Sequence, residues 1–498
     1  MRASKETLQH SLIELVRDLT IVVAAQLALC ALVRMGGLCA ISDDDYARVV
    51  IAQEFAHSPS WDPAGTSWLP LPFWVTGGAL MIGDASLDQA RLISLILSCL
   101  SAVTLYFSAA LLGCRGYFRV IAAVGAASIP YAAFLAIATV PEYPTAAAIV
   151  FGASSLYRSQ QGVEVPDSRL RVLGALIVAG ATASRYEAWP AALAVSAWNF
   201  WDFIQLKRQG RSPRIWLLVS AVVASCFLII WPIHGAVNHD HAFFFVNRVV
   251  DYKVALGEAS SSLLSSALVY PLALILQEPE LILATVLGSA GIFLARRGTA
   301  TLSALLRPWS VIGMLVLVLI VSAIRGGAPT HHPERALLSF WLMLALSFAQ
   351  LLSNNPPLVI RASSLALLGA VLGVSLRWQG FSPREPFTQR KAEEAMGRKL
   401  DSLLGQEAQV AILPPDFGYF AVMSAAGTPA RFKVLESHDP RDESHKAKGE
   451  QELQKWLRGG GCAFIAPRAT PRPAATVLHE EGNLRLFRSH RCDDRSAR

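Results

Sequence analysis

Long apolar segments alternate with short polar ones along the first three quarters of the chain. A helix needs about 20 mostly apolar residues to cross a membrane, and fewer where neighbouring helices or a cavity tolerate irregular backbone. By this measure the pattern predicts about eleven membrane spans in a mainly α-helical, polytopic membrane bundle. The expected spans are residues 19–38, 89–112, 119–138, 143–158, 171–185, 188–204, 215–233, 281–295, 308–324, 336–352 and 358–376.

The pattern changes after Leu376, where charged residues become frequent and the apolar runs shorten. Short apolar runs bounded by Gly, Pro, Asn and Asp indicate strands, whereas the apolar spacing of residues 389–404 and 450–457 indicates helices. The expected strands are residues 410–413, 432–435, 463–466 and 484–487, with a hairpin turn at 479–483. We therefore expect a membrane domain, residues 1–376, and a small C-terminal α/β domain, residues 377–498, called the tail below.

Composition and charge agree with a membrane protein. Hydrophobic residues make up 53% of the 498 residues and charged residues only 16%, which excludes an ordinary soluble enzyme. The net charge of +7 is therefore interpreted as membrane topology, and no nucleic-acid-binding module is visible. Basic residues in short loops stay on the cytoplasmic side. With the N-terminus inside, roughly twice as many Lys and Arg residues fall in cytoplasmic segments as outside.

This orientation predicts a multi-pass protein of the cell inner membrane with a cytoplasmic N-terminus and, because the number of spans is odd, a periplasmic tail. It also requires Leu263–Leu276 to be an outer-face or re-entrant segment, since a full span would move Arg296 and Arg297 outside. In an exported tail, Cys462 and Cys492 can form a disulfide. The spacing of the seven cysteines matches no zinc site.

The first outer loop, residues 39–88, begins with Ser42-Asp43-Asp44-Asp45-Tyr46. Three adjacent carboxylates at a membrane boundary are costly unless solvent, a partner, a metal ion or protonation compensates them. One interpretation is catalysis. The other is structural: Ser42 caps a helix whose first turn favours Asp, and Asp44 pairs with Arg48 four residues later.

Further along this loop, Trp61, Trp68 and Trp74 stand among three prolines. Such a segment is typical of interfacial helices that lie flat at the level of the lipid headgroups. Membrane anchoring explains any single tryptophan. A stiff, flat loop beside carboxylates is also suited to hold a lipid-linked headgroup, so Trp68 is a candidate substrate-binding residue.

Other ionisable residues lie at the expected outer ends of helices. Arg185-Tyr186-Glu187 interrupts an apolar stretch, where ionisable groups either serve a function or form an internal ion pair. Glu142 is either a substrate-binding residue or a solvated loop residue. His331 and His332 either bind a donor phosphate or belong to a plain interfacial loop, and Arg335 follows them.

A metal ion is a further alternative. The loop aspartates and these histidines leave room for a divalent cation, but two neighbouring histidines offer too few ligands, so no metal site is assigned. The run Asn238-His239-Asp240-His241 is either another weak metal candidate or a polar loop. No other cofactor is expected.

The order of these motifs resembles the membrane glycosyltransferases of the type C fold, in the branch of protein O-mannosyltransferases and lipid A aminoarabinose transferases. The resemblance covers about residues 12–376 and rests on Asp-Asp-x-Tyr after the first span, Trp68-Leu69-Pro70-Leu71, Asp88-Gln89-Ala90-Arg91-Leu92, Val140-Pro141-Glu142, Ser184-Arg185-Tyr186-Glu187 and His331-His332-Pro333-Glu334-Arg335. The sequence departs from the family's usual Asp-Glu pair by a third aspartate. It also has Trp68-Leu69-Pro70 where the family has Pro-Pro-Leu.

The resemblance implies a polyprenyl-phosphate-linked sugar as donor, an inverting transfer on the outer face, and a loop aspartate, here Asp43 or Asp44, as general base. Asp45 and the other candidates above are then expected to bind substrate. Residue chemistry alone supports the same reaction, because a carboxylate can take the acceptor's proton while Arg185 or Arg335 stabilises the leaving phosphate.

The expected partners are the donor, membrane lipids and an acceptor that is a glycan, a lipid or a protein. The alternative function is a polytopic transporter or lipid flippase, which also needs intramembrane charges. Transporters of known design usually show internal repeats and matching broken helices, and none is visible in this sequence. The layout therefore favours a glycosyltransferase.

Overall fold

The computed structural model describes residues 2–490 apart from Cys39, residues 159–167, 213, 256–261, 296–299, 327–331, 380–388, 406, 414–415, 437–438, 440–447 and 470–474. The helices before the tail are α1 (Arg2–Met35), α2 (Asp44–His57), α3 (Leu71–Leu80), α4 (Leu87–Leu111), α5 (Phe118–Ala127), α6 (Pro130–Leu135), α7 (Glu142–Arg158), α8 (Ser168–Thr182), α9 (Ala188–Arg208), α10 (Ile215–Asn238), α11 (Phe244–Ala255), α12 (Leu263–Leu276), α13 (Pro279–Phe293), α14 (Ala300–Ile324), α15 (Pro333–Ser353) and α16 (Val359–Trp378).

Among the described residues, six helices are long and apolar enough to cross a membrane, namely α1, α4, α10, α14, α15 and α16. The helices α12 and α13 pass the same test together, but they are bent by 74° at the break between them. Such a bend is found in a broken span and in a re-entrant loop. This geometry agrees with the re-entrant segment expected at Leu263–Leu276. The chain is a multi-pass membrane protein with a predominantly helical fold.

The remaining expected spans are shorter or less apolar helices. The segment 119–138 is not one helix, because α5 ends at Ala127 and Pro130, which has no backbone N–H to donate, opens α6. The other three, α7, α8 and α9, contribute many small buried residues to the largest hydrophobic cluster, including Ala153, Ala175 and Ala191. Small side chains let helices approach closely inside a membrane.

Glycine sets the closest helix contact of the bundle, between α13 and α16. A Cβ atom on Gly373 would lie 2.3 Å from the backbone nitrogen of Glu280, and one on Gly369 would lie 2.4 Å from the carbonyl oxygen of Leu283. A side chain at either position would therefore clash with backbone atoms of α13, which cannot move aside as a flexible side chain can. The pair α13 and α16 therefore requires glycine at both positions.

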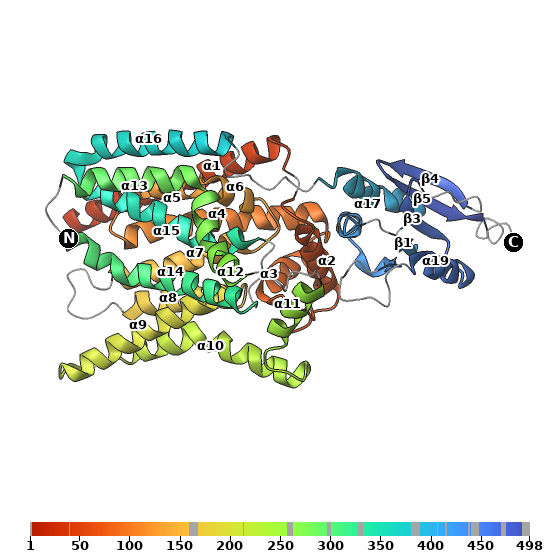
Figure 1. Ribbon diagram of the computed structural model, residues 1–498, viewed down its shortest axis with the longest axis horizontal. Helices are drawn as coiled ribbons and strands as arrows, with labels where there is room; N and C mark the ends of the chain where they lie inside the picture. Colours follow the sequence, from red (N-terminus) through yellow and green to blue (C-terminus); the bar gives the residue numbers. More distant parts are fainter. Residues whose placement is uncertain are drawn as a thin grey trace.

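The first outer loop connects the bundle to the tail. Its helices α2 and α3 lie at the end of the bundle that faces the tail, and the N-terminal end of α1 lies at the opposite end (Figure 1). Both helices are short, as the expected interfacial elements are, and Pro70 and Pro72 mark the start of α3. The loop is thus placed where bundle and tail meet.

The tail is a small α/β unit. Its elements are α17 (Lys391–Leu404), β1 (Val410–Ile412), α18 (Tyr419–Ala426), β2 (Phe432–Val434), α19 (Gly449–Arg458), β3 (Ala463–Pro467), β4 (Ala475–Glu481) and β5 (Leu484–Ser489). The strands form one sheet in the order β2-β1-β3-β5-β4, parallel from β2 to β3 and antiparallel at β5 and β4. The four expected strands are present.

Two tail elements were not expected from the sequence. Strand β4 alternates irregularly between exposed and half-buried positions and carries a bulge between Val477 and His479, so its apolar pattern is weak. Helix α18 is only eight residues long, too short to show a helical period. The turn expected at residues 479–483 is shorter, because β4 continues to Glu481. It contains Gly482, whose φ of 54° glycine adopts without steric cost.

The core of the tail continues into the first outer loop. Val50 of α2 belongs to the same hydrophobic cluster as Met396 and Ile412 of the tail, and Ala421 of α18 belongs to the cluster of Tyr46 and Leu80. The tail is therefore packed against the loop through buried apolar side chains.

Candidate active site

The three adjacent aspartates of the first outer loop occupy three different environments. Asp43 is the N-cap residue of α2, and no side chain makes a capping bond there. Instead, both of its carboxylate oxygens accept hydrogen bonds of 2.9 Å from the guanidinium of Arg390, at the start of the tail. Arg390 also donates to Asp416 at 2.9 Å. Asp43 is thus occupied by a partner from the tail.

Asp45 is buried in the protein. Its carboxylate accepts backbone N–H groups of Ser42 at 3.2 Å and Thr139 at 3.1 Å, and its carbonyl oxygen accepts the Thr139 hydroxyl at 2.8 Å. Burial raises the pKa of Asp45 to about 6, although Arg335 and these hydrogen bonds oppose the shift. Asp45 therefore connects the first outer loop by hydrogen bonds to Thr139, in the segment before α7.

Asp44 is the accessible member of the three. Its side chain is 46% exposed, and its closest charged partner is Arg335, whose Nη1 lies 3.5 Å from Oδ2. The expected pairing of Asp44 with Arg48 is not formed among the described contacts, because Arg48 has no ion pair. The Ser42 hydroxyl accepts from Nη2 of Arg335 at 2.9 Å and does not cap α2. The structural interpretation of this run is therefore not supported.

Asp44 is the exposed member of a set of otherwise largely buried charges that we call the charge cluster: Asp44, Arg48, Glu142, Arg185, Glu187 and Arg335. Oε1 of Glu142 accepts from Nη1 of Arg185 at 2.6 Å and lies 3.8 Å from Nη1 of Arg335. Arg185 also donates to Glu187. The residues of the charge cluster come from α2, α7, α15 and the connection between α8 and α9, so the fold brings together motifs that lie far apart in the sequence.

Arg48 is the unusual member of the charge cluster. It is buried, and its Nε and Nη1 atoms have no hydrogen-bond partner. Its guanidinium lies 4.5 Å from the ring centre of Trp68 and 5.8 Å from that of Phe73, which are cation–π contacts. Burial lowers the pKa of Arg48, although Glu142 and Asp44 oppose the shift, and an arginine remains a cation at neutral pH.

The charge cluster is not saturated elsewhere either. Oε2 of Glu142 and Nε of Arg335 are buried and also lack hydrogen-bond partners. An unsatisfied buried polar group costs about 1–3 kcal/mol, and more when it is charged. Several such charged groups at one place favour a bound ligand or ordered water there.

Trp68 and Tyr186 line two different surfaces beside the charge cluster. Trp68 covers Arg48, as a substrate-binding residue of the loop would. Tyr186 turns away into an aromatic cluster: its hydroxyl accepts from the indole of Trp231 at 3.2 Å, and its ring stacks on Phe245 at 4.5 Å. The backbone N–H of Leu71 donates to the carbonyl of Ala183 at 3.0 Å and joins the loop to this region.

The histidine motif is described only in part. His331 lies outside the described residues. Nδ1 of His332 lies 3.4 Å from Oε1 of Glu334, which also accepts from the hydroxyl of Tyr131 at 3.2 Å. Among the described residues, Asp43, Asp44, Asp45 and His332 belong to no group with metal-ligand spacing.

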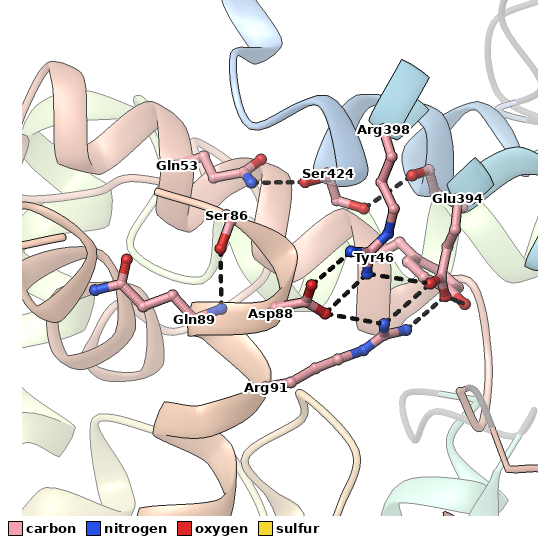
Figure 2. Close-up of polar contacts among 10 residues, drawn as sticks. Tyr46, Gln53, Ser86, Asp88, Gln89, Arg91, Glu394, Arg398 and Ser424 are labelled. Carbon is pink, nitrogen blue, oxygen red and sulfur yellow. Dashed lines mark hydrogen bonds and ion pairs between the residues drawn. The ribbon is translucent and has the colours of Figure 1, made fainter. Parts of the chain in front are cut away.

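The tail contacts the first outer loop and α4 through one stripe of α17 and through α18, where the carbonyl oxygen of Ser424 accepts from Gln53 at 2.8 Å (Figure 2). Glu394 accepts from Arg91 at 2.5 and 3.0 Å and from the hydroxyl of Tyr46 at 2.8 Å. Arg398 donates to both oxygens of Asp88 at 2.5 and 2.8 Å. With Arg390, these residues are spaced by four, so all three face the membrane domain.

Sequence reasoning missed Arg390 and gave Arg48 a different role. The spacing of Arg48 from Asp44 predicts an ion pair, and only the fold shows that Trp68 takes the place of that partner. Arg390 is 347 positions from Asp43. The sequence of residues 389–404 predicts only a charged helix and does not indicate this contact. Glu334 was part of the histidine motif but had no assigned role.

Comparison with known proteins agrees with this geometry at the level of the fold. No protein-family model and no curated protein sequence matches the chain. Among solved structures, ArnT from Cupriavidus metallidurans in the apo state matches with a TM-score of 0.56 and 12% identity over 97% of this chain and 98% of that chain. The same ArnT bound to undecaprenyl phosphate gives a TM-score of 0.57 and 12% identity over 96% and 98%. This chain has the ArnT fold.

The match with ArnT includes the bundle and the tail, because it covers nearly the whole of both chains. The type C glycosyltransferase fold inferred from the ordered motifs is thereby confirmed. The oligosaccharyltransferase of Archaeoglobus fulgidus is a more distant neighbour, with a TM-score of 0.46 and 16% identity over 90% of this chain and 68% of that one.

Proposed function

We propose that the protein is a membrane glycosyltransferase that moves a sugar from a polyprenyl-phosphate-linked donor to an acceptor hydroxyl at the outer face of the membrane. The observation that carries the proposal is a buried, unpaired guanidinium, Arg48, in one cluster with a half-exposed carboxylate, Asp44. One of the two ArnT structures is bound to undecaprenyl phosphate. A phosphate is an anion that a guanidinium binds through forked hydrogen bonds.

The proposed reaction is a single displacement. The acceptor oxygen attacks the anomeric carbon and forms the new glycosidic bond, while its proton passes to the carboxylate of Asp44. The bond between the anomeric carbon and the phosphate oxygen breaks, and its electron pair stays on the phosphate. Arg48 stabilises the charge that grows on this leaving group, so no general acid is needed. Displacement from the opposite face inverts the anomeric centre.

Asp44 fits the role of base better than its neighbours. Both oxygens of Asp43 are engaged by Arg390, and Asp45 is enclosed and bonded to backbone N–H groups. A general base must reach a substrate proton directly. Asp44 is exposed enough to do so and lies beside the arginines that the leaving phosphate needs. Glu142 and Glu187 hold Arg185 in place behind it.

The outer face is proposed as the working side. Cys462 of the tail is disulfide-bonded, and disulfides persist in oxidising compartments. The tail contacts the loop that carries the three aspartates, so both belong to the same side of the membrane. The distribution of basic residues in the sequence supports a cytoplasmic N-terminus and hence a periplasmic working side.

The deciding experiment compares envelope glycans and lipids, by mass spectrometry, in cells that lack the protein and in cells that carry the wild type or a variant. Asp44→Asn is expected to lower the sugar-modified product about 10²- to 10⁴-fold, the usual contribution of a general base. Asp43→Asn, which only weakens the contact with Arg390, is expected to stay within about tenfold of the wild type. Full product from Asp44→Asn at equal expression would overturn the assignment.

A further inference from the structure

A second polar cluster lies apart from the charge cluster, between the first outer loop and the end of α10. It consists of Asp62, His234 and His239, whose ligand atoms all lie within 4.8 Å of one another. Oδ2 of Asp62 is 3.1 Å from Nε2 of His239 and 3.5 Å from Nε2 of His234. Two of the three side chains are about nine-tenths buried, Asp62 at 9% exposure and His234 at 11%. The proposed transfer reaction uses none of them.

Hydrogen bonding alone does not satisfy this cluster. His239 and Asp62 can share a hydrogen bond. Nε2 of His234, however, is buried and has no hydrogen-bond partner, although it points at the same carboxylate oxygen. Leaving such an atom unsatisfied costs about 1–3 kcal/mol. A cation at the point where the three atoms converge removes that cost and neutralises the carboxylate.

The spacing fits a transition metal. Two donor atoms bound at about 2.0–2.1 Å to a tetrahedral zinc ion lie about 3.3 Å apart, close to the two separations from Asp62. Two imidazoles and one carboxylate are a ligand set that zinc takes, whereas Mg²⁺ and Ca²⁺ prefer oxygen ligands throughout. We propose that Asp62, His234 and His239 bind one divalent transition-metal ion, preferably Zn²⁺, with the fourth position open to water.

The surrounding residues hold the three ligands in place. The imidazole of His234 stacks on Trp231 at 4.8 Å, and that of His239 stacks on Phe244 at 3.9 Å. Oδ1 of Asp62 accepts from the backbone N–H of Gly65 at 3.1 Å, which leaves Oδ2 for the ion. Ligands with fixed rings lose little freedom on binding a metal.

Asn238 provides a further, outer contact. Its side-chain amide lies 2.9 Å from Nδ1 of His234. The amide nitrogen also donates to the backbone carbonyl of His234 at 3.2 Å, so Asn238 holds this end of α10 in place.

The ion would join two elements that are distant in the sequence. Asp62 belongs to the loop that carries Trp68, and His234 and His239 belong to the outer end of α10. Trp231, which stacks on His234, also donates to the hydroxyl of Tyr186. The proposed role is therefore to fix the first outer loop against the region of Arg185.

Metal content of the purified full-length protein in detergent tests the site. After removal of metal and dialysis against equimolar Zn²⁺, the wild type is expected to keep about one zinc per chain, and His234→Ala and His239→Ala less than about a tenth of that. His241→Ala is the matched control and is expected to keep the ion, because His241 lies outside the cluster.

Co²⁺ binding to the wild type gives a readout that needs no variant. A tetrahedral site gives the strong visible absorption typical of four-coordinate cobalt, and added Zn²⁺ abolishes it. Absence of both zinc and these cobalt bands in the wild type would overturn the proposal. So would zinc retained by His234→Ala at the wild-type level. Neither result depends on sugar transfer, so failure of the metal site and failure of the proposed reaction are distinguishable.

Discussion

Two of the buried charge networks in the described part of the chain use the same residue types in opposite ways. In one, which we call the Asp202 network, Asp202 of α9 accepts from Arg171 at 2.6 Å and from Arg307 at 2.8 and 2.9 Å. Arg171 also donates to Asn199 at 3.2 Å, and Arg307 lies over the ring of Trp198. None of its buried polar atoms lacks a hydrogen-bond partner.

The charge cluster has the same kinds of groups but does not satisfy them. Arg48, Glu142 and Arg335 each have at least one buried polar atom without a partner. Both networks are buried in the membrane domain, so burial and charge alone do not separate structure from function. What distinguishes these two networks is the completeness of their hydrogen bonding. A closed network holds helices together, and an open one is prepared for a charged ligand.

Among the substitutions considered, loss of the Asp202 carboxylate is expected to lower the free energy of unfolding most. Asp202→Asn leaves the fully buried Arg171 without its anion, and removal of one partner of a buried pair costs about 3–5 kcal/mol of unfolding free energy. Sugar transfer per folded molecule is expected to stay near the wild-type value. Detergent-mediated unfolding and a product assay at equal folded protein measure the two quantities. A variant as stable as the wild type would contradict the structural role.

A smaller effect is expected when the open network is changed. Arg48→Met keeps an apolar side chain against Trp68 but removes the charge, so binding of undecaprenyl phosphate is expected to weaken about 10- to 150-fold, the range for lost charged hydrogen bonds. Thermal stability is expected to hold or rise, because Arg48 has no hydrogen bond to lose. Titration of the lipid onto purified protein measures the affinity. Unchanged affinity in this variant would remove Arg48 from the phosphate site.

A still smaller change is expected in the pH dependence of the free energy of unfolding, to which Asp45 contributes. Because burial raises the pKa of Asp45 to about 6, its protonated form is favoured in the folded state. The resulting stability is fully present below about pH 4 and is lost as the pH rises through about 6. Asp45→Asn, which cannot ionise, is expected to lose this slope. Unfolding measured between pH 4 and 7 for both proteins gives the difference, and parallel curves would refute it.

The sequence predicted the fold well where the signal was periodic. Alternating apolar and polar segments indicated the bundle, and the ordered motifs indicated the fold that the ArnT comparison supports. Boundaries were weaker: α1 begins at Arg2 and not near Leu19, because a helix continues past the point where its residues become polar. Helical propensity does not depend on hydropathy, so the apolar run marks only the buried part of that helix.

The site was predicted as a set of residues but not as a set of roles. Glu142, Arg185 and Arg335 were expected near the aspartates, and the structure brings them together. The different environments of Asp43, Asp44 and Asp45 were not predictable, because they depend on Arg390 of the tail and on the backbone of Thr139. Contacts across hundreds of residues leave no trace in local spacing.

The stripe of α17 that faces the membrane domain has a practical consequence for anyone who builds chimeras. Glu394 engages Arg91 and Tyr46, and Val50 lies within the tail's own hydrophobic cluster. A tail borrowed from another protein would therefore arrive without its counterparts on α2 and α4. A chimera should therefore keep the C-terminal quarter of the chain together with the residues of α2 and α4 that it contacts.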